Sequence, residues 1–180
     1  MSNVNLRLKM MRFYICIFSL LIVLFSCTTE ERTISSISVS EVSKSACKGN
    51  SYAKTTRSAV DSEEKTSLII GTLTNQSSKC TFENIAGNCD LNKIYVAGAL
   101  QNGTIVICVY KTEKTMADCY CDYDVSFNLG NIEENKYPIK IYVTDGLQKT
   151  DTGRLIYEGT VTFSKKTDLI QQIDIPKITL

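Results

Sequence analysis

Apolar and polar residues alternate along residues 119–129, CYCDYDVSFNL. The odd positions are cysteine, aromatic or aliphatic, and the even positions are mostly polar. Successive side chains of a strand point to opposite faces, so this pattern predicts a strand with one buried face. Further short apolar or alternating runs are found at residues 67–73, 79–85, 92–100, 105–111, 137–145, 153–163 and 168–180. The last of these is predicted as a strand or as a short helical turn.

Residues 92–111 carry a hairpin signal. Asn102 and Gly103 separate two apolar runs, and this dipeptide supplies the positive φ values of a type I′ turn. A two-residue loop pairs residues whose numbers sum to about 205. This register places Ile105, Ile107 and Val109 on one face, predicted to be the core, and directs Cys108 away from it.

Seven or eight strands at intervals of about 10–15 residues, with turns between them, predict an all-β domain. We expect an antiparallel, immunoglobulin-like β-sandwich over residues 67–180. Residues 27–66 are rich in Ser, Thr and charge and poor in large apolar residues, so they are predicted to be a flexible tether.

Residues 1–26 have the pattern of a signal peptide. Arg7, Lys9 and Arg12 precede an apolar run of about 13 residues, 13–25. This length lies within the roughly 7–15 residues of a signal core and below the roughly 20 of a spanning helix. Met10 or Met11 is an alternative start.

The sequence LFSC, residues 24–27, resembles the lipobox of bacterial lipoproteins. That resemblance implies cleavage before Cys27 and acylation of this cysteine, which anchors a protein to a membrane without spanning it. The TTEER sequence that follows resembles a surface-export tag, so we expect the outer membrane and its outer surface, with a periplasm-facing position as the alternative. A plain secretory signal or an uncleaved anchor is the alternative to lipidation.

Composition excludes several classes of function. The net charge of +1 gives no electrostatic basis for binding nucleic acid. The absence of histidine removes Ser–His–Asp and Cys–His catalysis and His-ligated metals. We therefore predict no catalytic residue, metal or cofactor. A carboxylate hydrolase using Glu133 and Glu134 has little support, because adjacent acids on a loop are usually solvated.

Six cysteines remain beyond Cys16 in the signal and Cys27. They are Cys47, Cys80, Cys89, Cys108, Cys119 and Cys121. An even number in an exported domain predicts up to three disulfides, while a thiolate metal site or a redox pair stays open.

Strand geometry bears on the two closest cysteines. Cys119 and Cys121 would lie about 6.6 Å apart on one strand face, with parallel Cβ directions that disfavour a mutual bond. Each is predicted to reach a distant cysteine, with Cys47, Cys80 and Cys89 available. Asp122 and Asp124, on the opposite face, are predicted to be solvated.

The sequences NCD, CYCDYDVSFNL and YPIKIYV are similar to those of small cysteine-rich envelope lipoproteins of Gram-negative bacteria, which carry a C-x-C-x-Y-D signature. The resemblance covers roughly residues 67–165. It implies an envelope location and a β-sandwich, and it implies no activity, because that group is functionally uncharacterised.

We therefore expect a non-enzymatic binding or structural module displayed from a membrane. Tyr95, Tyr110 and Tyr120 are candidate contacts for a protein or glycan ligand. The alternative is an envelope thiol-redox or metal-binding protein that uses Cys119 and Cys121.

Overall fold

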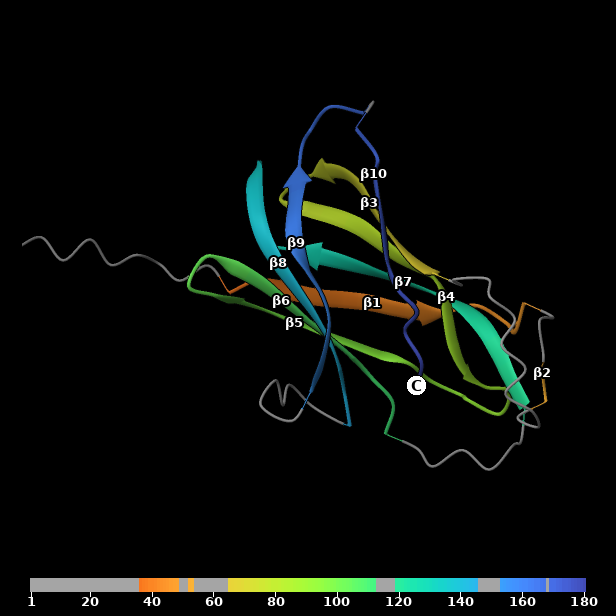
Figure 1. Cartoon of the computed structure of the whole chain (residues 1–180). Coiled ribbons are helices and arrows are strands. Elements are labelled where there is room, and N and C mark those ends of the chain that lie inside the picture. Colours follow the sequence, from red (N-terminus) through yellow and green to blue (C-terminus); the bar gives the residue numbers. More distant parts are fainter. Residues whose placement is uncertain (1–35, 49–51, 54–64, 113–118, 146–152, 168) are drawn as a thin grey trace, which may run out of the picture. The chain divides into compact units, whose positions relative to one another are not determined.

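The computed structural model describes residues 36–48, 52–53, 65–112, 119–145, 153–167 and 169–180 (Figure 1). This part of the chain is all-β. Its strands are β1 (Ser38–Lys44), β2 (Tyr52–Ala53), β3 (Lys65–Thr74), β4 (Ser77–Asn88), β5 (Tyr95–Gln101), β6 (Thr104–Tyr110), β7 (Cys119–Gly130), β8 (Asn135–Thr144), β9 (Arg154–Phe163) and β10 (Gln171–Pro176). Within these ranges no helix has the length and apolar character needed to cross a membrane.

The strands form two sheets that share one hydrophobic core. The larger sheet has the order β1-β7-β4-β3-β10, with β2 also paired to β7, and the smaller has the order β5-β6-β8-β9 (Figure 1). Inward side chains of both sheets belong to a single buried cluster. The predicted all-β sandwich is confirmed, with ten described strands instead of seven or eight.

One strand pairing departs from the antiparallel prediction. β6 pairs with β8 in parallel, whereas every other pairing among the described strands is antiparallel. The cause is the route of the chain between them. Between β6 and β8 the chain passes through β7 in the other sheet, so it returns to the small sheet running in its original direction.

The β5–β6 hairpin has the predicted register. Tyr95 pairs with Tyr110 and Gly98 with Ile107, and the turn residues Asn102 and Gly103 have φ values of 49° and 77°. Residues 105, 107 and 109 are buried in the core, as predicted, whereas Cys108 is not part of the core cluster. Turn chemistry and hydrophobic period were thus sufficient to fix this register.

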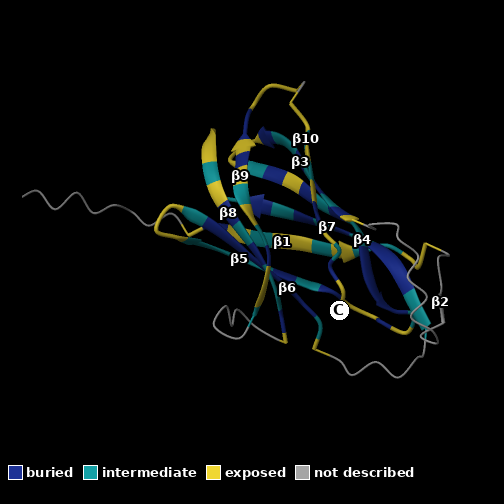
Figure 2. Ribbon diagram, in the orientation of Figure 1, coloured by how far each residue is buried: buried dark blue, intermediate teal, exposed yellow. Residues whose placement is uncertain are grey.

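β7 lies between its neighbours inside the larger sheet. It pairs with β1 and β2 on one side and with β4 on the other. Its inward side chains are buried, and the rings of Phe127 and Phe82 stack with centroids 5.5 Å apart. Every residue of β7 is buried or half-buried, whereas every residue of β1 is exposed or half-buried (Figure 2). The alternating pattern of residues 119–129 therefore predicted the buried face correctly.

The predicted tether, residues 27–66, contains a strand of the sheet. Ser38–Lys44 forms β1 and pairs with the C-terminal half of β7, with a register shift between Ser40 and Ser43. Val39 and Val42 pack against the core from this strand. A strand can form here with few apolar residues, because β1 lies at the edge of the sheet and contributes few side chains to the core. Residues 1–35, with the predicted signal and Cys27, lie outside the described residues, as do 49–51 and 54–64.

The C-terminal run also resolves as a strand rather than a helical turn. β10 pairs with β3, and the chain then continues beside β4, where Ala86 N–H donates to the carbonyl of Ile178 at 2.8 Å. Ile178 is fully buried. The last residues thus extend the larger sheet beside β4, beyond Lys65 at the start of β3.

Replacing Gly103 with Val should destabilise the hairpin through the backbone alone. No atom lies within 4 Å of a Cβ built at Gly103, so the cost comes from its φ of +77° and should be about 1–2 kcal/mol. Urea unfolding of the disulfide-intact protein measures it. Gly103→Asn is the matched control, because Asn tolerates this conformation; equal losses in both variants would contradict the type I′ turn.

Candidate functional site

The two cysteines of the C-x-C sequence form separate disulfides. Cys121 bonds to Cys47 with a Cα–Cα distance of 5.4 Å, and Cys119 bonds to Cys89 with a Cα–Cα distance of 5.6 Å. Cys119 and Cys121 do not bond to each other, as strand geometry predicted. The partners are 74 and 30 residues away in sequence, so both bonds fasten distant segments to the start of β7.

The remaining two cysteines are free and buried, so the third possible disulfide is not formed. Cys80 faces the core from the larger sheet, whereas Cys108 faces away from the core on the smaller sheet. Burial raises the pKa of the Cys80 thiol to about 12 and also raises the pKa of Cys108. Neither thiol is poised as a thiolate nucleophile or metal ligand.

A metal or redox centre at Cys119 and Cys121 would need both disulfides to be reduced. Within the described ranges, no cluster of three or more Cys, Asp or Glu side chains is arranged to hold a metal ion. In this structure the C-x-C sequence provides two covalent cross-links.

Asp122 was predicted to be solvated, and this prediction is wrong. Its side chain is 5% exposed, and Lys177 Nζ lies 2.8 Å from its Oδ1. That oxygen has no hydrogen-bond donor in bonding geometry among the described residues, so charge attraction rather than a directed hydrogen bond describes the pair. The C-terminal segment beside β4 brings Lys177 to this position, a contact between residues far apart in sequence.

Asp124 lies two residues further along the same strand face and is more open. Lys48 Nζ lies 2.6 Å from its carboxylate, and the N–H of Asn84 donates to the same oxygen at 3.1 Å. Its side chain is 28% exposed. Both aspartates therefore hold neighbouring segments in place.

Glu133 and Glu134 each make a separate contact with a neighbouring segment of the chain. Glu134 accepts hydrogen bonds from Lys165 N–H at 3.2 Å and Ser164 Oγ at 3.0 Å, and the backbone donor is the main reason that its pKa is lowered. A carboxylate held ionised in this way is suited to fixing the chain after β9 rather than to donating a proton. The backbone carbonyl of Glu133 accepts a hydrogen bond from Tyr137 at 3.4 Å.

The smaller sheet has a side that points away from the core, which we call the outer face. Its residues on β5, β6 and β8 are Tyr95, Ala97, Ala99, Gln101, Thr104, Val106, Cys108, Tyr110, Lys136, Pro138, Lys140, Tyr142 and Thr144. Away from the turn, its residues on β5 and β6 are apolar or tyrosine, whereas the turn end and β8 add polar side chains. Val106 and Cys108 are only 6% and 3% exposed, because they lie on the inner strand β6 between the side chains of β5 and β8.

Two of the three predicted tyrosines lie on the outer face. The rings of Tyr95 and Tyr110 stack with centroids 5.2 Å apart at 11°, and Lys93 Nζ lies 4.7 Å above the Tyr95 ring. Tyr120 instead belongs to β7 in the larger sheet, where it pairs with Tyr52. Tyr120 is therefore not part of the outer face of the smaller sheet.

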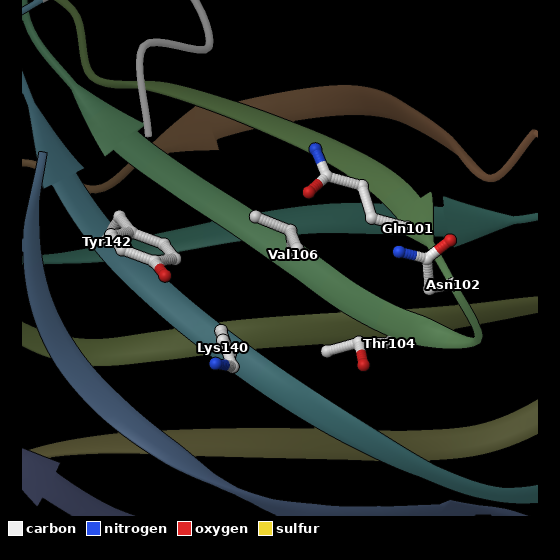
Figure 3. Close-up of a pocket in the computed structure, with 6 residues that line it drawn as sticks. All are labelled: Gln101, Asn102, Thr104, Val106, Lys140 and Tyr142. Atoms are coloured by element: carbon white, nitrogen blue, oxygen red, sulfur yellow. The ribbon is translucent and has the colours of Figure 1, made fainter. Parts of the chain in front are cut away.

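A hollow of about 240 Å³ lies at the end of the outer face opposite the tyrosine pair. It is lined by Gln101, Asn102, Thr104, Val106, Lys140 and Tyr142. Figure 3 shows Val106 at the middle, with the other five side chains around it. Sequence reasoning missed this site because it combines the β5–β6 turn with β8, and the parallel β6–β8 pairing was not foreseen.

Comparisons with protein-family models, with curated proteins and with solved structures found no match to this chain. The resemblance to cysteine-rich envelope lipoproteins therefore rests on the sequence motifs alone.

Replacing Lys177 with Met should cost more stability than replacing Lys48 with Met. Loss of Lys177 leaves the buried Asp122 carboxylate without its counter-charge, a defect worth about 3 kcal/mol. Loss of Lys48 should cost about 1 kcal/mol or less, because Asp124 is partly solvated and keeps the Asn84 N–H. Urea unfolding of both variants checks the difference, and equal losses would contradict the burial of Asp122.

Proposed function

We propose that the protein is a lipid-anchored cell-envelope protein, a non-enzymatic binding module displayed from the outer membrane. The N-terminal pattern supports the lipid anchor. It consists of three basic residues, an apolar run over residues 13–25 and Cys27 directly after Ser26. Acylation of Cys27 would hold the sandwich at the membrane without a spanning helix. The acidic residues after Cys27 favour the outer surface over the periplasmic side.

The disulfides support an exported location. Structural disulfides persist in oxidising compartments and are rare where thiols are kept reduced. Both bonds here join segments far apart in the chain and tie them to β7. This is the arrangement expected of a small envelope domain that is stabilised outside the cytoplasm.

The roles of the polar groups support a non-enzymatic module. The chain has no histidine. The carboxylates of Asp122, Asp124 and Glu134 hold backbone segments or pair with lysines, and burial raises the pKa of both free thiols. A structural role therefore accounts for each of these carboxylates and thiols.

The outer face supports binding. Interaction surfaces are enriched in tyrosine, and ligand sites are concave with a few polar groups. The outer face combines a stacked tyrosine pair with a polar-lined hollow, so a protein or glycan ligand fits it. Thiol-redox or metal chemistry at Cys119 and Cys121 is the less supported alternative, because each cysteine is bonded to a different partner.

Cys27→Ala should abolish lipid attachment. Metabolic labelling of cells with an alkyne analogue of palmitate, followed by intact mass measurement, reads this out. The wild type should carry label and lack residues 1–26, whereas the variant should carry no label. Cys16→Ala is the matched control, because Cys16 lies in the same N-terminal region and should leave labelling unchanged. Label that persists in Cys27→Ala would refute the anchor.

A further inference from the structure

We infer that the hollow on the outer face binds a neutral saccharide of two or three sugar rings. This inference rests on the proposed binding function and gives that function a ligand class.

The polar groups of the hollow match sugar hydroxyls. The amides of Gln101 and Asn102 and the hydroxyl of Thr104 each donate and accept hydrogen bonds, as sugar hydroxyls do. Within the described ranges these three side chains make no hydrogen bond to the protein, so they are available to a ligand. The turn accounts for Asn at position 102, whereas it does not require Gln101 or Thr104.

The charge of the hollow favours a neutral ligand. Lys140 is its only ionisable amine among the lining residues, and its Nζ lies 3.1 Å from Glu158 on the adjacent strand β9. An anion would have to compete with this carboxylate and would approach its negative charge. A phosphate or a uronic acid is therefore a poorer match than an uncharged sugar.

The shape of the hollow sets the size of the ligand. Thr104 lies near one end, and Cys108, which pairs with Tyr142, lies four residues further along β6, or about 13 Å at about 3.3 Å per residue. The volume of about 240 Å³ is smaller than that of sites that enclose drug-sized molecules, so a saccharide lying along β6 would stay partly exposed to solvent. A short chain of sugar rings laid along β6 fits this length.

The hollow also has apolar surface that suits the C–H groups of a sugar ring. Val106 provides an apolar floor in the middle of the hollow, and the Tyr142 ring lies beside it (Figure 3). The face of an aromatic ring carries partial negative charge and attracts the polarised C–H groups of a sugar ring. We assign Tyr142 to stacking against one sugar ring, and Gln101, Asn102 and Thr104 to hydrogen bonding with the next.

Binding of defined trisaccharides to the full-length lipidated protein tests this assignment. The protein is held in micelles of a sugar-free detergent and titrated with maltotriose, cellotriose, mannotriose or galactotriose, with trigalacturonic acid as the charged counterpart. Ligand-observed NMR measures each Kd. At least one neutral trisaccharide should bind with a Kd of about 1 mM, as expected for a small, open site.

Variants locate the site. Tyr142→Ala and Gln101→Ala should each weaken binding about tenfold, which corresponds to about 1.4 kcal/mol, while Tyr142→Phe should retain it. Tyr95→Ala is the matched control, because Tyr95 lies on the same outer face but does not line the hollow. Its Kd should stay within about twofold of the wild type, a change of less than about 0.5 kcal/mol.

Several outcomes would overturn the inference. They are no binding of any neutral trisaccharide at about ten times the expected Kd, tighter binding of trigalacturonic acid, or equal losses in Tyr142→Ala and Tyr95→Ala. The last result would indicate a ligand that covers the whole outer face, as a protein does. Lipid labelling at Cys27 is unaffected by these results, so failure here is distinguishable from failure of the proposed anchor.

Discussion

Strand β7 is the constraint on which the rest of the structure depends. It pairs with β4 on one side and with β1 and β2 on the other, and its alternate side chains fill the core of the sandwich. Disulfides at Cys119 and Cys121 fasten its first residues to Cys89 and Cys47. Closing a segment of 74 residues is worth roughly 4 kcal/mol in the chain-entropy model, so this end of β7 is the most strongly cross-linked part of the described chain.

The position of β7 also shapes the surface on the other sheet. Because the chain crosses to the larger sheet between β6 and β8, these two strands run in parallel and lie side by side. Val106 then lies beside Lys140, and Cys108 beside Tyr142. The hollow is thus a consequence of topology, and its lining comes from segments that the sequence separates by the whole of β7.

Local patterns predicted local structure well. The Asn102-Gly103 turn and the period of two fixed the β5–β6 register, and the strict alternation of residues 119–129 identified the inward face of β7. Contacts between distant segments were not predictable. The polar segment β1 joins the larger sheet because it pairs with β7. Asp122 is buried because the C-terminal segment brings Lys177 to it. The hollow depends on the pairing of β6 with β8, which are distant in sequence, so no sequence motif predicts it.

Peptide mapping after alkylation of the native, unreduced protein tests the central role of β7 most directly. The structure predicts linked peptides for Cys47–Cys121 and Cys89–Cys119, with Cys80 and Cys108 alkylated only after unfolding, because both are buried and their pKa values are raised. Alkylation of Cys119 or Cys121 in the native protein, or a bond between these two cysteines, would contradict it.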